Sequence, residues 1–224
     1  MVQFGSALVI GASGGIGAAL AAELGARGVA VTGLSRSADG LDVTDAGSVE
    51  AYLGALAGPY DLIFVATGAL EIGGRRPEKA LRQLDAEALM AQFALNAIGP
   101  ALVMRHAPRL MPREGRAVFA ALSARVGSIG DNGYGGWYGY RAAKAALNQL
   151  LHTGAIEIAR SHREAVVAAL HPGTVATPLT SKYAGRHPTV TPDHAAGRLI
   201  DVAASLTPAQ TGGFFDYSGA EIPW

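Results

Sequence analysis

The strongest constraint on the fold is that short, almost wholly apolar segments alternate with alanine-rich stretches of helical spacing. A short segment that is apolar at nearly every position is typical of a strand buried on both faces. The apolar segments are Ala7–Ile10, Val29–Thr32, Leu62–Ala66, Ala117–Leu122 and Val166–Leu170. The helical stretches are Ile16–Arg27, Ser48–Ala57, Asp85–Met111, Tyr140–Ala159 and Pro192–Ser205. This alternation predicts an α/β fold with a doubly wound parallel sheet, as a single domain over residues 1–224.

The longest irregular segments all follow predicted strands. They are Gly68–Leu81, Arg125–Gly139 and Pro172–Thr191. Because the strands run parallel, these segments should meet at the carboxyl edge of the sheet, where folds of this kind bind ligands.

Composition excludes several classes of protein. With 18 basic and 18 acidic residues the net charge is zero, so neither a nucleic-acid surface nor a membrane-seeking basic face is expected. The absence of cysteine excludes disulfides and thiolate metal sites, and the scattered histidines predict no metal site. The first apolar run ends at Gly11, too short for export or membrane spanning, so we expect a cytoplasmic protein.

A glycine-rich loop follows the first predicted strand and leads directly into a helix. Gly11, Gly15 and Gly17 allow a tight turn in which backbone N–H groups approach a pyrophosphate at the helix N-terminus. The spacing differs from the general dinucleotide fingerprint, and the alternative is a plain strand-to-helix turn. The residues expected to contact a dinucleotide here are Gly11, Ser13, Gly14, Gly15, Ile16 and Gly17.

The end of the second predicted strand indicates which dinucleotide binds. An acidic residue here would accept from the ribose 2′-hydroxyl of NAD(H), whereas an arginine suits the 2′-phosphate of NADP(H). Ser35 and Arg36 therefore favour NADP(H) over NAD(H), with a solvated loop charge as the alternative for Arg36. Asp42, followed by Val43, is placed either to meet the adenine edge or to cap the helix beginning near Asp45.

Tyr140 and Lys144 are four residues apart at the start of a predicted helix, so they share one helix face. An ammonium about 4 Å from a phenol would favour the phenolate by roughly 4 kcal/mol at an effective dielectric of about 20. That is about three pKa units, enough to bring a tyrosine near neutral pH. The pattern also arises by chance on solvated helices, so it depends on the glycine loop for its meaning.

Taken together, the motifs resemble the short-chain dehydrogenase/reductase family, and more narrowly its C-factor and sniffer-type carbonyl reductase branch. The motifs are G-A-S-G-G-I-G at residues 11–17, N-A-I-G-P at 96–100, S-A-R-V-G-S-I at 123–129, Y-R-A-A-K at 140–144 and H-P-G-T-V-A-T-P at 171–178. The resemblance implies a Rossmann fold, a nicotinamide cofactor and a small-molecule carbonyl or alcohol substrate.

The resemblance also implies residue roles. Tyr140 would exchange a proton with the substrate oxygen, and Lys144 would lower its pKa and bind the nicotinamide ribose. Asn96 would anchor a relay water through its carbonyl, which Pro100, lacking an N–H, leaves without its helical partner. The alternative for Pro100 is a simple helix kink. The family's cofactor loop corresponds to Pro172, Gly173, Val175 and Thr177, with Thr177 bonding a carboxamide or phosphate.

Two departures from the family pattern affect the site. The usual N-N-A-G is here V-A-T-G, so Thr67 is the candidate replacement hydroxyl and Gly68 still permits close approach to a cofactor. Ala124 occupies the position of the catalytic serine. Because strand side chains alternate, Ser123 should point away from where its neighbour points. Three alternatives stay open: Ser123 is presented by a twist or bulge, Ser128 replaces it, or neither acts.

The remaining expectations concern the pocket rim and assembly. Trp137, Tyr138 and Tyr134 either wall an apolar pocket or serve packing, and Leu179 and Tyr183 lie on a loop that could fold over a substrate. The aromatic tail 214–224 packs in the core or makes a subunit contact. Family resemblance implies a homodimer or homotetramer. The alternative function is a C-factor-like signalling or NADP(H)-sensing protein with residual or no catalysis.

Overall fold

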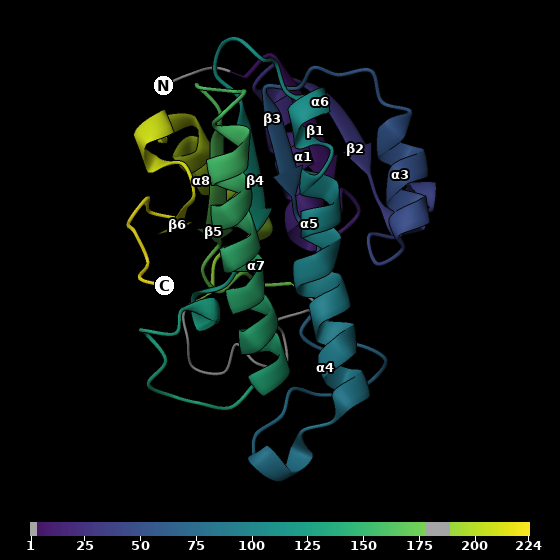
Figure 1. Ribbon diagram of the computed structural model, residues 1–224, viewed down its shortest axis with the longest axis vertical. Helices are drawn as coiled ribbons and strands as arrows, with labels where there is room; N and C mark the ends of the chain where they lie inside the picture. The colour runs from purple at the N-terminus through teal and green to yellow at the C-terminus, as the bar shows by residue number, and fades with distance from the viewer. Residues whose placement is uncertain (1–3, 178–188) are drawn as a thin grey trace.

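A computed structural model describes residues 4–177 and 189–224, and these contain one parallel sheet of six strands in the order β2-β1-β3-β4-β5-β6 (Figure 1). The strands are β1 (Ser6–Ile10), β2 (Ala30–Leu34), β3 (Leu62–Val65), β4 (Val118–Leu122), β5 (Val166–His171) and β6 (Gly213–Asp216). The predicted doubly wound sheet is confirmed. The strand order reverses beside β1, between β2 and β3, and a crevice forms at such a switch point.

Helices cover both faces of the sheet. The main helices are α1 (Gly15–Ala26), α3 (Ala46–Gly54), α4 (Ala86–Phe93), α5 (Gly99–Met104), α7 (Tyr138–Ile158) and α8 (Pro192–Ser205). The short ones are α2 (Arg36–Asp39), α6 (Ala107–Leu110), the π-helical η2 (Ala94–Ile98) and the 3₁₀ turns η1 (Leu81–Gln83), η3 (Arg125–Gly127) and η4 (Pro208–Gln210). α4 and the start of α7 extend beyond the carboxyl edge of the sheet (Figure 1).

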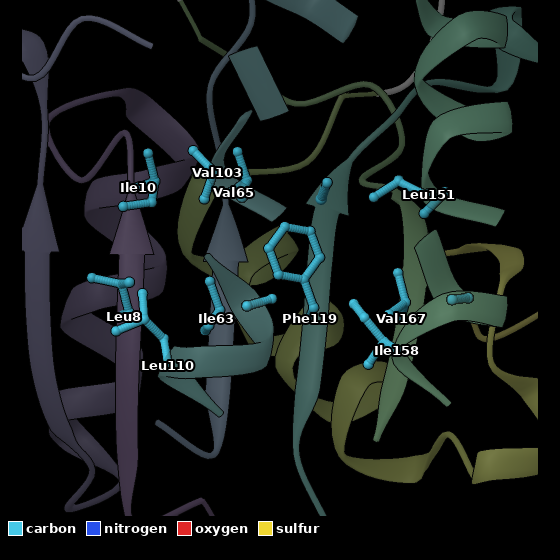
Figure 2. Packing of buried hydrophobic residues seen from close by; sticks show 14 of the residues in the cluster. Leu8, Ile10, Ile63, Val65, Val103, Leu110, Phe119, Leu151, Ile158 and Val167 are labelled. Carbon is cyan, nitrogen blue, oxygen red and sulfur yellow. The ribbon is translucent and has the colours of Figure 1, made fainter. Parts of the chain in front are cut away.

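Alternating side chains of the same strands build two cores. In β4, Phe119 packs with α7 and α5 on one face, where Figure 2 shows it between Ile63 and Val167. Its neighbours Val118 and Ala120 pack with α1 and α8 on the other face. This explains why the strand sequences are continuously apolar, since neither face meets water.

The predicted helix Asp85–Met111 differs from the observed structure. It is divided into α4, η2, α5 and α6, with Pro100 at the start of α5. Proline lacks the N–H that would continue the α-helical ladder, and a π-helical turn accommodates such a break. Ala86–Met104 is long and apolar enough to cross a membrane by length and composition. In the fold it packs against α7, so its apolar face serves the protein core.

One strand, β6, was not predicted from the sequence. β6 lies at the sheet edge beside β5, inside the aromatic tail. Phe214 and Ile222 are buried, which confirms core packing for this part of the tail. Trp224 stacks on Phe214 but is 44% exposed, and the subunit contact stays a prediction. The strand is brief and its apolar run contains only Phe214 and Phe215, which left no strand-length signal to recognise.

Candidate active site

A cavity of about 420 Å³ lies at the carboxyl edge of the sheet, and a second of about 260 Å³ shares residues with it. The first is lined by the predicted residues Ser13, Gly14, Gly15, Ile16, Thr67, Gly68, Ser123, Tyr140, Lys144, Pro172, Gly173, Val175 and Thr177. The second is lined by Gly11, Ser35, Arg36, Asp42 and Val43, together with Ser13, Gly14, Thr67 and Gly68. The fold therefore gathers the predicted site residues, apart from Gly17 and Asn96, around two cavities that share part of their lining.

The glycine loop forms a cradle that side chains would fill. A Cβ on Gly17 would lie 2.1 Å from the Gly11 carbonyl oxygen, and one on Gly15 would lie 2.9 Å from Cγ2 of Thr177. Gly11 has φ +88° and its Cβ would lie 3.0 Å from the Ala66 backbone. The loop can close tightly only with glycine at these positions, and it brings the N-terminus of α1 to the cavity, as an anion site requires.

The second cavity is lined by the residues predicted to favour NADP(H) over NAD(H). Ser35 caps α2 by accepting from the Ala38 N–H, which places Arg36 at the first position of that helix on the cavity wall. Asp45, not Asp42, caps α3. The hydroxyl and N–H of Thr44 donate to Asp42, and these bonds hold the Asp42 pKa below its usual value.

Tyr140 and Lys144 lie together at the main cavity, with Nζ of Lys144 5.8 Å from the centre of the phenol ring. Nζ also donates to the carbonyl of Leu122 at the end of β4, over 2.8 Å. The predicted shared helix face is confirmed.

The predicted electrostatic effect is wrong for the protein chain alone. Burial raises the pKa of Tyr140 to about 12 and lowers the pKa of Lys144 to about 7. Desolvation disfavours both charged forms, and an amine with a pKa near neutral carries only part of the positive charge that the sequence argument assumed. The phenol is therefore protonated at neutral pH.

Asn96 has a role that the sequence did not reveal. Its side chain is fully buried, accepts from the Ala69 N–H over 3.1 Å and donates to the Ala69 carbonyl over 2.9 Å. It also donates to Gln92, which in turn donates to the Leu70 carbonyl. These bonds fix the loop after β3 to η2 and α4.

The same asparagine brings the loop to the lysine. A Cβ on Gly68 would lie 2.9 Å from Oδ1 of Asn96 and 3.5 Å from Nζ of Lys144. Gly68 and Lys144 line the cavity, and Asn96 lies directly behind Gly68 without lining the cavity itself. The water role of the Asn96 carbonyl stays a prediction.

The serine alternatives can be compared by their hydrogen bonds. Ser123 lies at the cavity, yet its hydroxyl donates over 2.6 Å to Oδ1 of Asn148, the residue one helical turn after Lys144. Both side chains are almost completely buried. Ser128 accepts from the Asp131 N–H and is not part of the cavity lining. Ala124 does line the cavity and has no hydroxyl.

Thr67 provides an independent test of whether a cofactor fits. Its Oγ1 is buried at the junction of both cavities and has no hydrogen-bond partner within the part of the chain that the structure describes. A buried hydroxyl is normally paired, so this atom fits a site completed by a polar ligand. With the glycine cradle beside it, the residues that line the two cavities fit a nicotinamide dinucleotide.

Of the two alternatives for the aromatic residues 134, 137 and 138, a pocket wall or packing, the described residues do not show the pocket wall. Tyr134 is 97% exposed, and neither it, Trp137 nor Tyr138 belongs to the cavity lining. Trp137 instead contacts the ring of Tyr140 edge to face, with ring centres 6.4 Å apart. Leu179 and Tyr183 lie outside the described residues.

The chain belongs to the short-chain dehydrogenase family, whose model matches residues 6–187. The glycine cradle and the Tyr140–Lys144 pair lie within that range. This family consists of oxidoreductases, and six parallel strands with helices on both faces match its solved members.

Two relatives match over most of their length. The chain is 33% identical to the 1-hydroxy-2-glutathionyl-2-methyl-3-butene dehydrogenase of Rhodococcus sp. strain AD45, over 97% of this chain and 98% of that protein. It is 35% identical to the C-signal of Myxococcus xanthus, over 65% of this chain and 84% of that protein.

Solved structures agree with the fold. A short-chain dehydrogenase/reductase of Burkholderia multivorans with bound NADP superposes with a TM-score of 0.80 at 25% identity, over 99% of this chain and all of that chain. The carbonyl reductase Sniffer of D. melanogaster superposes with a TM-score of 0.78 at 18% identity, over 98% of this chain and 99% of that chain.

Proposed function

We propose that this protein is an NADP(H)-dependent oxidoreductase that transfers hydride between nicotinamide and the carbon of a carbonyl or secondary alcohol. The observation that carries the proposal is the position of Tyr140 and Lys144 on the same cavity as the glycine cradle. When bound, the cofactor supplies the hydride chemistry, and the protein supplies orientation and the proton.

The proton chemistry follows from the two pKa values. Burial raises the pKa of Tyr140 to about 12, so the phenol holds its proton at neutral pH and is a weak acid on its own. To donate that proton to a substrate oxygen during reduction, it needs positive charge beside the phenolate that it leaves. The phenolate that remains lies beside Lys144. The pKa of that amine is about 7, so near neutral pH it can take up a proton and, as an ammonium, stabilise the phenolate. We propose that a water on the Asn96 carbonyl returns the proton to this pair.

Selection of NADP(H) over NAD(H) is assigned to Arg36, which lines the second cavity. The B. multivorans neighbour with bound NADP supports NADP(H) as the cofactor. A charged hydrogen bond contributes about 1.5–3 kcal/mol, so Arg36→Ala should weaken NADPH binding about 10- to 150-fold and leave NADH binding nearly unchanged. Arg113→Ala, in an exposed loop before β4, is the matched control. Equal losses for both dinucleotides would refute the 2′-phosphate role.

A steady-state assay with NADPH and a panel of aldehydes, ketones and quinones tests the activity. The oxidative panel should include alcohols with a glutathionyl group, because the Rhodococcus relative is named for one. We expect turnover that falls by at least about 100-fold in Tyr140→Phe, since general acid catalysis contributes about 10²–10⁴-fold. Turnover that survives this substitution would contradict the role of Tyr140.

A signalling or NADP(H)-sensing protein is the second candidate function. Ala124 at the family's serine position and the engagement of Ser123 by Asn148 favour it, and so does the resemblance to the C-signal. Tight NADPH binding without turnover across the panel would support this candidate and exclude the first.

We also propose that the protein is cytoplasmic, assembles as a homodimer or homotetramer, and has neither nucleic-acid nor membrane partners. The balanced charge and the family resemblance support these points. Light scattering coupled to gel filtration measures the assembly directly.

A further inference from the structure

The helix that carries Tyr140 begins in an unusual way. Its N-cap residue is Trp137, which has φ +51° and makes no capping hydrogen bond with its side chain. A bulky residue rarely adopts this left-handed conformation, and such backbone strain persists only where the surrounding structure holds it.

Glu78, from the loop between β3 and η1, holds this helix start at two points. Its backbone carbonyl accepts from the Trp137 N–H over 2.5 Å, and its Oε2 accepts from the Gly139 N–H over 3.1 Å. Glu78 is only 7% exposed, which is rare for a glutamate, and a buried carboxylate needs such donors. One distant residue thus satisfies two of the N–H groups that every helix start leaves unpaired.

The contact with Glu78 requires a glycine at position 139. A Cβ at Gly139 would lie 2.9 Å from Oε1 of Glu78 and within 3.3 Å of atoms of Gln92 and Leu89 on α4. The glycine therefore lets the first turn of α7 close onto the carboxylate and onto α4. The positive end of a 21-residue helix also favours an anion at this place. The next residue in the chain is Tyr140.

We infer that Glu78 is a positioning residue for Tyr140: its carboxylate fixes the first turn of α7 and thereby the phenol relative to Lys144 and the cavity. Its effect on catalysis rests on the proposed function, whereas its effect on the helix start does not.

The kinetic test compares Glu78→Ala with Glu78→Gln. A misplacement of about 1 Å can cost about 10²-fold in rate, so Glu78→Ala should lower kcat about 10- to 100-fold while the KM and the Kd for NADPH stay within about twofold. Glu78→Gln keeps an oxygen that accepts from Gly139 and should restore kcat to within about threefold of the wild type. Asp45→Ala removes a comparable cap from α3 and should leave kcat unchanged.

A second readout does not depend on activity. Trp137 and Trp224 are the two tryptophans of the chain, so in a Trp224→Phe background the fluorescence reports on Trp137 alone. Glu78→Ala should increase acrylamide quenching of Trp137, because the helix start loosens, while Asp45→Ala should not. If Glu78→Ala does not fold, Glu78→Asp, which shortens the side chain by one methylene, should give an intermediate loss in both readouts.

The outcomes are distinguishable. An unchanged kcat and unchanged quenching in Glu78→Ala would overturn the inference, and so would a glutamine variant as impaired as the alanine variant. A wild-type protein without turnover would contradict the proposed function, and the quenching experiment would still decide the role of Glu78.

Discussion

The missing serine gives a prediction with an unusual sign: Ala124→Ser should make the protein faster. Ala124 lines the cavity, whereas the hydroxyl of Ser123 is committed to Asn148 over 2.6 Å in a nearly fully buried pair. Ala124→Ser would add a hydroxyl on the cavity wall that is not hydrogen-bonded to Asn148.

The size of the gain follows from the cost of releasing Ser123. Turning its hydroxyl to a substrate would leave a buried amide oxygen unpaired, which costs about 1–3 kcal/mol, or roughly 5- to 150-fold. A positioned donor to a developing oxyanion is worth about 10²–10³ in rate. A hydroxyl on Ala124 that reaches the oxyanion should therefore raise kcat about 10- to 100-fold.

Single-turnover stopped-flow oxidation of NADPH measures the step directly. Ala124→Cys is the matched control, because a thiol has a similar size and is a weak donor, and it should give little gain. Ser123→Ala should lower the free energy of unfolding by about 1–3 kcal/mol with a smaller effect on kcat. The reasoning is refuted if Ala124→Ser leaves kcat within twofold while Ser123→Ala reduces it more than about 100-fold, since Ser123 would then serve the substrate.

Two further predictions concern stability. Burial lowers the pKa of Lys144 to about 7, so the buried ammonium destabilises the fold fully below that pH, and this cost falls as the pH rises toward the unfolded pKa near 10.4. In urea unfolding, Lys144→Met should therefore stabilise the protein more at pH 6 than at pH 9, by up to about 3 kcal/mol. An equal effect at both pH values would contradict the burial argument. Gly17→Ala places a Cβ 2.1 Å from the Gly11 carbonyl, so it should abolish NADPH binding in a fluorescence titration and lower the melting temperature. Gly25→Ala on the same helix meets nothing within 4 Å, so it should keep NADPH binding and stabilise the fold by about 0.5–1 kcal/mol.

Much of the site could be predicted because its chemistry is local in sequence. The glycine loop, Arg36 and the Tyr140–Lys144 pair depend on a strand, a turn and one helix face, and each of those has a short-range signal. The parallel sheet then brings the carboxyl ends of separate strands to one edge whatever the loop lengths, so the residues of distant segments that were predicted to bind the cofactor line the two cavities there.

Other features of the site depend on hydrogen bonds between segments that are far apart in the sequence and share no recognisable pattern. Glu78 lies 61 positions before Gly139, and Ser123 lies 25 before Asn148, so no periodicity links either pair. The π-helical turn at Asn96 was hidden inside a continuous helical pattern, and only the proline suggested a break.

The sequence by itself determined the layers and the strand polarity and identified Tyr140 and Lys144 as the candidate reacting groups, because apolar periodicity, glycine position and helix spacing act over a few residues. Tertiary structure decided the ionisation of those groups. Burial, which no spacing reveals, keeps the Tyr140 phenol protonated and brings the Lys144 pKa close to neutral, so desolvation outweighs the attraction that their separation alone would suggest.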